Sequence, residues 1–226
     1  MMGKITVEEF QHVLDTLDSG VLSYGSHTEE DGLFCAIECL NKVRLPHMPC
    51  FDDPSGFADI RHLNDAFGKG HEADVARTNE ILPLIAELSD WHEWSSHRQV
   101  VFATELVISL VRETIAHLPG LPDDIKIQCI DTDNVGKAAK AAKAVDGTAV
   151  SSAASREAVI AAVAAVKAVE AADAVAKAVV NAAARAARAA ARAAGPEGSS
   201  SNVPVLHAII QYWHAAIEKS LHTPVR

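Results

Sequence analysis

Residues 158–166 read AVIAAVAAV and belong to an alanine- and valine-rich run that extends from Ala149 to Ala194. Alanine has the strongest helix propensity because it loses no side-chain rotamer freedom in a helix. The run therefore predicts helix, and KAAKAAKAV at residues 137–145 predicts a shorter helix that Gly147 separates from it. An unbroken long helix would exceed about forty residues, so we expect a turn near Ala171 to Asp173.

Helical periodicity also extends over the remainder of the chain. A capping box, TVEE at Thr6 to Glu9, starts the first predicted helix, and Gly20 ends that segment. Further helices are predicted over residues 28–43 with Thr28 as N-cap, 58–67, 72–89 with a kink or restart near Pro83, 96–115 with Ser96 as N-cap, and 205–221. IKIQCI at residues 125–130 is the only strand-like alternation, and we expect a connector there.

These patterns predict an all-α fold, a compact multi-helix bundle with long alanine-rich helices. Residues 1–134 form an acidic helical region with a cysteine, histidine and carboxylate cluster. Residues 135–195 form the alanine-rich helices. Residues 196–226 form a linker and a C-terminal helix that packs back on the same core.

The alanine-rich segment needs larger partners, because a buried methyl group contributes far less than a buried leucine. We expect it to pack against residues 100–115 and 206–217, which carry large apolar side chains. The arginines at helical spacing should turn toward water or toward the acidic N-terminal half; they are Arg185, Arg188 and Arg192. A free stalk or a self-associating surface is the competing interpretation, and a glutamate at Ala164 is expected to distinguish these cases.

Charge is distributed unevenly along a chain of net charge −10. Residues 1–136 carry 24 acidic and 9 basic side chains, whereas residues 137–195 carry 4 acidic and 9 basic ones. The overall acidity argues against non-specific nucleic-acid binding, which needs a clustered cationic surface. The absence of a signal-peptide pattern and of a bilayer-length apolar stretch predicts a soluble, cytoplasmic protein. The four cysteines are too sparse for a disulfide scaffold and are expected to be reduced.

Three cysteines and a histidine lie close together in the sequence. Cys35, Cys39, His47 and Cys50 have the spacing C-x3-C-x7-H-x2-C, and two thiolates one helical turn apart can supply half of a tetrahedral zinc site. The spacing matches no established zinc module. Buried cysteines without a ligand role are common, so ordinary packing of Cys35 and Cys39 is the favoured interpretation.

A second constellation overlaps the first and combines His27, Glu38 and His47 with nearby aspartates. Mixed histidine and carboxylate ligands suit zinc, manganese or iron with an open position for water. His27 and Glu38 are separated by roughly 16 Å along an ideal helix, so they can share a metal only if the preceding loop folds back. Glu38 is better explained as a buried acceptor for His47 or for loop amides.

Four stretches of the N-terminal half resemble a group of bacterial and phage proteins that continue into alanine-rich helices. They are GSHTEEDGLFCAIE at residues 25–38, LPHMPCFDDP at 45–54, LNDAF at 63–67 and ARTNEILPLIAEL at 76–88. The resemblance implies an all-helical fold and no assigned activity. The positions that match its pattern are His27, Cys35, Glu38, His47, Asn64 and Asp65, whereas Cys39 is peculiar to this chain. Asn64 and Asp65 are expected to bind nearby backbone, as a cap or on the proline-rich loop, and not to act in catalysis.

No nucleophile elbow, metalloprotease, P-loop or dinucleotide motif is present in the sequence. We therefore expect a non-enzymatic interaction or structural module, with zinc as the candidate stabilising metal. A protein partner or self-association would be its mode of action. The alternative is a metal-dependent hydrolase centred on His27, Glu38 and His47.

Overall fold

The chain is all-α in a computed structural model that describes residues 4–25, 33–46, 60–148, 152–170, 176–195 and 202–223. Ten α-helices form within these ranges, and the β pairing there is limited to one isolated bridge between Leu22 and Phe34. The fold-class prediction is confirmed. None of the described helices is both long enough and apolar enough to cross a bilayer.

The α-helices are distributed along all the described parts of the chain. They are α1 (Val7–Leu14), α2 (Ala36–Arg44), α3 (Arg61–Asp65), α4 (His71–Leu88), α5 (Ser96–Ser109), α6 (Asp123–Ile130), α7 (Val135–Asp146), α8 (Ala153–Glu170), α9 (Ala176–Ala194) and α10 (Asn202–His222). Three short turns of other helix types are η2 (Trp91–Glu93), the π-helical η3 (Leu110–Thr114) and η4 (Ile115–His117).

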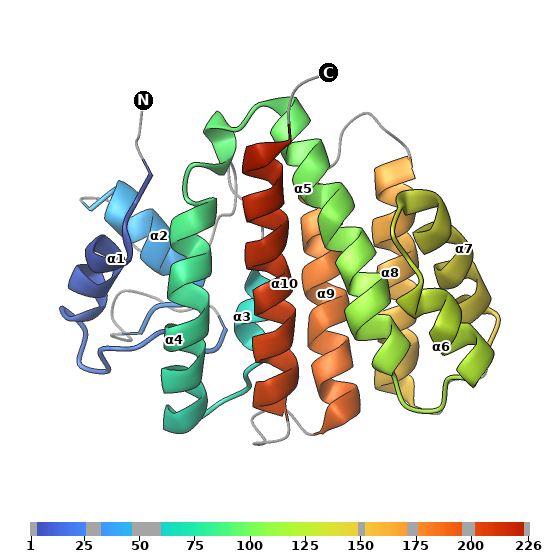
Figure 1. Cartoon of the computed structure of the whole chain (residues 1–226). Helices are drawn as coiled ribbons and strands as arrows, with labels where there is room; N and C mark the ends of the chain where they lie inside the picture. Colours follow the sequence, from blue (N-terminus) through green and yellow to red (C-terminus); the bar gives the residue numbers. More distant parts are fainter. Residues whose placement is uncertain are drawn as a thin grey trace.

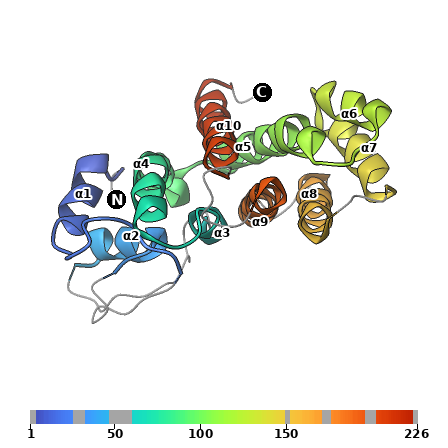
Figure 2. The ribbon, with the colours of Figure 1, turned by 90° about the horizontal axis from the view of Figure 1, so that it is seen from below.

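Two rows of helices make up the central part of the molecule. Helices α3, α9 and α8 lie side by side in one row, and α4, α10 and α5 lie in the other (Figures 1 and 2). Helices α1 and α2 flank one end of the rows, and α6 and α7 flank the opposite end (Figure 2). One apolar core joins them, from Ile5 near the start of the described chain to Ile217 in α10.

Helices α8 and α9 pack against the helices that carry large apolar side chains, as predicted. Helix α9 packs against α5, α8 and α10, and α8 also packs against α5. Ala165 in α8 and Ala184 and Ala187 in α9 are fully buried, because their small side chains allow close helix approach. An ion-pair distance of 3.5 Å between Glu157 at the start of α8 and Arg192 at the end of α9 shows that these helices run antiparallel. The long run therefore forms two helices, and the turn predicted near Ala171 to Asp173 lies outside the described residues.

An aromatic cluster closes one end of the core. Phe102 in α5 contacts Trp91 and Trp94 at ring-centroid distances of 5.7 Å each, and it contacts Trp213 of α10 at 6.0 Å.

Two histidine–glutamate pairs, spaced seven residues apart, join α10 to α4 along their length. The Nδ1 atoms of His207 and His214 each lie 2.8 Å from a carboxylate oxygen of Glu80 and Glu87, respectively.

Two of the predicted elements begin or fold differently. Helix α2 begins at Ala36, because residues 22–23 pair with Phe34, whose carbonyl accepts from the Ser23 amide at 2.8 Å. The Thr28 cap lies outside the described residues. IKIQCI belongs to helix α6, where Asp123 and Asp124 occupy a first turn that favours negative charge.

Three predicted helix boundaries shift slightly. Ser95, not Ser96, caps α5, since its hydroxyl accepts from the Arg98 amide at 3.2 Å. Beyond Ser109 that helix continues as π-helix and then as 3-10 helix to His117. Helix α10 begins at Asn202, because Pro204 is tolerated in a first turn, where no amide donor is required. The capping box of Thr6 and Glu9 forms as predicted.

Candidate functional site

Three described motif residues of the N-terminal half, Cys35, Glu38 and Asn64, lie together at the start of α2. Glu38 is fully buried, and its Oε2 accepts from the Cys35 amide at 2.7 Å. This bond satisfies one of the amides that a helix start leaves without an intrahelical partner. The prediction that Glu38 accepts from a loop amide is confirmed, and His47, its other predicted partner, lies outside the described residues.

Asn64 connects this helix start to an earlier segment of the chain. From α3, its Oδ1 accepts from the Ala36 amide at 3.3 Å, while its Nδ2 donates to the Ser23 carbonyl at 3.1 Å. Its neighbour Asp65 accepts from the Gly25 amide at 3.1 Å. Both side chains therefore bind backbone, as predicted. Their observed partners are residues 23–25 and 36, whereas residues 47–59 of the proline-rich loop are not described.

Arg77 is a buried residue of this cluster that sequence reasoning missed. It is fully buried in α4 and donates to the carbonyls of Asn64 at 2.8 Å and Leu22 at 3.0 Å. It also binds the Gly68 carbonyl and the Asp74 carboxylate. The sequence held a sign of this buried arginine, because Arg77 is a lone cation on an apolar helix and follows an aspartate by three residues.

The two described cysteines of the predicted zinc quartet, Cys35 and Cys39, are buried thiols. Cys35 is the N-cap of α2, and Cys39 packs one turn later with its sulfur 3.9 Å from the Phe10 carbonyl. Within the described ranges, no three histidine, cysteine or carboxylate side chains group closely enough to hold a metal. His27, His47 and Cys50 lie outside those ranges, so the metal site of Cys35, Glu38, Cys39 and these three residues stays a prediction.

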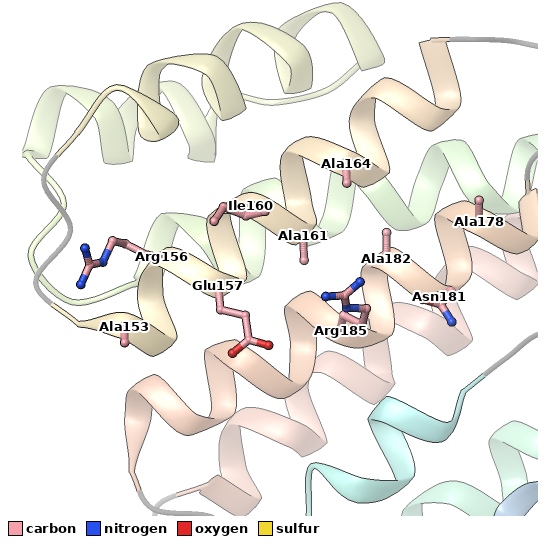
Figure 3. Close-up of a pocket in the computed structure, with 10 residues that line it drawn as sticks. All are labelled: Ala153, Arg156, Glu157, Ile160, Ala161, Ala164, Ala178, Asn181, Ala182 and Arg185. Carbon is pink, nitrogen blue, oxygen red and sulfur yellow. The ribbon is translucent and has the colours of Figure 1, made fainter.

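A different feature is exposed on the outer side of the alanine-rich helices. A groove of about 730 Å³ runs between α8 and α9, with ten lining residues contributed by the two helices (Figure 3). Five of the ten are alanines, and Ile160 is the largest apolar side chain among the ten. Ile160 is 64% exposed, more than any other large apolar side chain in the described structure.

Charged side chains border this groove. Arg156 of α8 and Arg185 of α9 are exposed, and neither side chain makes an ion pair or hydrogen bond in the described structure. Glu157 lies beside them, and Arg192 pairs with it at 3.5 Å. The groove thus combines an apolar floor with two arginines available to a partner.

Comparisons of this chain with protein-family models, with curated proteins and with solved structures gave no match.

Proposed function

We propose that this protein is a non-enzymatic interaction module, and that the groove between α8 and α9 binds a helix of a partner protein. The observation that supports this proposal is the exposed Ile160 above a floor of alanines. An amphipathic helix that lays its apolar face into such a groove is a recurrent mode of recognition. Alanine on the floor lets the partner's backbone come close, as small residues do between packed helices.

The charges on the rim define the chemistry of the partner. Arg156 and Arg185 lie on opposite helices of the groove, and each is exposed without a partner side chain among the described residues. Residues 137–195 are basic within an otherwise acidic chain. A helix with an apolar face and acidic flanks complements both features. We therefore infer that the partner is an acidic amphipathic helix, because charge complementarity raises the association rate and selects the partner.

A synthetic helical peptide tests this proposal directly. The probe is an amphipathic peptide with leucines on one face and glutamates on both flanks, and the comparison peptide has lysine in place of each glutamate. Fluorescence anisotropy should show saturable binding of the acidic peptide, at least about tenfold tighter than that of the lysine peptide. Absence of saturable binding, or equal binding of the two peptides, would contradict the proposal.

Matched variants locate the binding surface. Ile160→Asp and Arg185→Glu should each weaken the acidic peptide at least about tenfold. Ile127→Asp is the control, because Ile127 is also exposed, at 58%, but lies on α6 outside the groove. Light scattering on the same samples separates a partner from self-association: a dimeric wild type that Ile160→Asp converts to monomer would identify a second copy of the chain as the occupant.

The alternative function, a metal-dependent hydrolase, has less support. Glu38 binds the Cys35 amide, which is a structural use of the carboxylate. A stabilising zinc on Cys35, Cys39, His47 and Cys50 remains a separate proposal, supported by two buried thiols one helical turn apart. Metal analysis of protein purified without an affinity tag tests both proposals. A near-stoichiometric transition metal that Cys50→Ser removes would support the zinc site, and metal-free folded protein would rule it out.

A further inference from the structure

A second cavity lies where η3 and η4 meet α9 and α10. Its volume is about 320 Å³, at the lower end of the range for small-molecule pockets. Apolar side chains such as Leu118, Val205 and Ile209 form most of its wall. Four side chains add hydrogen-bonding groups: Glu113, Thr114, His117 and Tyr212. An apolar cavity with a few convergent polar groups is the usual form of a binding site for a small organic molecule.

The helix that carries two of these polar groups is irregular. Residues 110–114 form a π-helix, and the Ile115 amide bonds to the Leu110 carbonyl five residues earlier. Glu113 and Thr114 lie in this wide turn and line the cavity. Single π-turns within α-helices are uncommon and occur frequently at functional sites. The π-helix is thus a second observation, made on the backbone, and it places two of the polar side chains in the wall of the cavity.

The cavity also borders a smaller void in the core. Thr114, Ile209 and Tyr212 line both spaces, and the inner void of about 10 Å³ reaches Trp213. A space of that size is about the minimum that holds one water molecule. A ligand in the outer cavity would therefore lie near an indole ring, which supplies a fluorescence signal for binding.

The charge of the lining selects the ligand class. Glu113 is the only acidic side chain among the described residues of the wall, and none of those residues is a lysine or an arginine. Its Oε1 accepts from Arg112 Nε at 2.5 Å, and Arg112 lies outside the wall. Burial, followed by the charge of Glu113, raises the pKa of Tyr212, and the charge of Arg112 opposes this shift only in part. The phenol therefore stays neutral and can donate or accept a hydrogen bond.

We propose that this cavity binds a small organic amine, with its apolar body between η4 and α10 and its protonated nitrogen beside Glu113. A carboxylate offers a charge-assisted hydrogen bond to an ammonium group, and the neighbouring phenol ring adds a favourable face for a cation. This site is distinct from the groove between α8 and α9, and the two proposals can fail independently.

The experiment compares three probes of similar shape and different charge. They are 2-phenylethylamine, the neutral 2-phenylethanol and the anionic phenylacetate, each titrated into the full chain and followed by amide chemical-shift changes and tryptophan fluorescence. The amine should saturate with a Kd on the order of 1 mM, with shifts in residues 113–119 and 204–212. The alcohol should bind at least about fivefold more weakly, and phenylacetate should not saturate. Equal binding of amine and alcohol, or shifts located elsewhere, would overturn the proposal.

Variants distinguish the site from non-specific binding. Glu113→Gln should weaken the amine at least about fivefold and leave the alcohol unchanged, which a purely structural role of Glu113 would not produce. Ala208→Leu fills the cavity and should abolish binding of both probes, whereas Ala215→Leu, at an exposed position of α10 outside the cavity, should not. Thermal unfolding verifies that each variant is folded. Unchanged amine affinity in folded Glu113→Gln, or in folded Ala208→Leu, would show that the amine does not bind in this cavity beside Glu113.

Discussion

The guanidinium group of Arg188 lies 3.6 Å from the carboxylate of Asp65 and links α9 to α3. The same guanidinium donates to the Tyr24 hydroxyl at 3.0 Å. Asp65 in turn accepts from the Gly25 amide, so the basic alanine-rich helix is connected to the hydrogen-bonded cluster of the acidic N-terminal half. Of the three arginines at helical spacing, Arg188 faces the acidic half, whereas Arg185 and Arg192 are exposed.

Replacing Arg188 should destabilise the fold more than replacing Arg185. Arg188→Ala removes a partly buried ion pair and a hydrogen bond, and we expect the free energy of unfolding to fall by about 1–3 kcal/mol. Arg185→Ala is the control on the same helix, with an expected change within about 0.5 kcal/mol. Urea denaturation measures both values. Equal losses in the two variants would show that the Arg188 contacts do not stabilise the protein.

A glutamate should affect stability very differently at two adjacent alanines. Ala165 is fully buried between α8 and its neighbours, so Ala165→Glu should cost several kcal/mol or prevent folding. Ala164 is exposed in the groove, and Ala164→Glu should change stability by less than about 1 kcal/mol. Circular dichroism during thermal unfolding compares the two. A glutamate at Ala164 therefore cannot report on packing in the core, contrary to the expectation from the sequence, because the Ala164 side chain lies on the outer side of α8.

The thiol of Cys129 should be inert at neutral pH. Burial raises its pKa from an ordinary value of 9.0 to about 11, so the reactive thiolate is scarce in the folded protein. Alkylation of Cys129 by iodoacetamide at pH 8, followed by peptide mass spectrometry, should be at least about 100-fold slower in native than in denatured protein. Comparable rates in the two states would contradict this burial.

The same thiol should lower the free energy of unfolding at alkaline pH. The unfolded thiol ionises near pH 9 and the folded one near 11. The protonated, buried thiol of Cys129 therefore contributes its full stabilisation below about pH 9, and this stabilisation is lost as pH rises to about 11, because the unfolded state then releases its proton first. The wild type should therefore lose up to about 2–3 kcal/mol of unfolding free energy over this range relative to Cys129→Ala. Parallel pH profiles for the two proteins would refute the assignment.

Asn64 should be one of the most sensitive polar positions of the fold. Asn64→Ala leaves the Ser23 carbonyl and the Ala36 amide without these partners in a buried site, and we expect a loss of about 2–4 kcal/mol. Asn79→Ala is the matched control, because Asn79 is exposed on α4, with an expected change within about 0.5 kcal/mol. Chemical denaturation of both variants measures the difference, and similar stabilities would disprove a structural role for Asn64.

Local chemistry made several elements predictable from the sequence. Alanine's helix propensity predicted α7, α8 and α9, and the TVEE pattern located the start of α1 to the residue. The aromatic and leucine-rich faces of α5 and α10 indicated the partners of the alanine helices. Such signals depend on the conformational preference of one residue or on neighbours within one or two helical turns, so the sequence determined the fold class and the positions of most helices.

Tertiary contacts decided what the local pattern left open. The start of α2 depends on pairing of Phe34 with residues 22–23 and on the Asn64 side chain 28 residues from Ala36. The burial of Ala165 and the exposure of Ala164 depend on the placement of α5 and α9, because an all-apolar stretch such as AVIAAVAAV has no polar face to orient it. Arg188 and Tyr24, which are 164 residues apart, meet only in the folded chain. No local preference specifies such contacts, because their geometry exists only after distant segments have packed together.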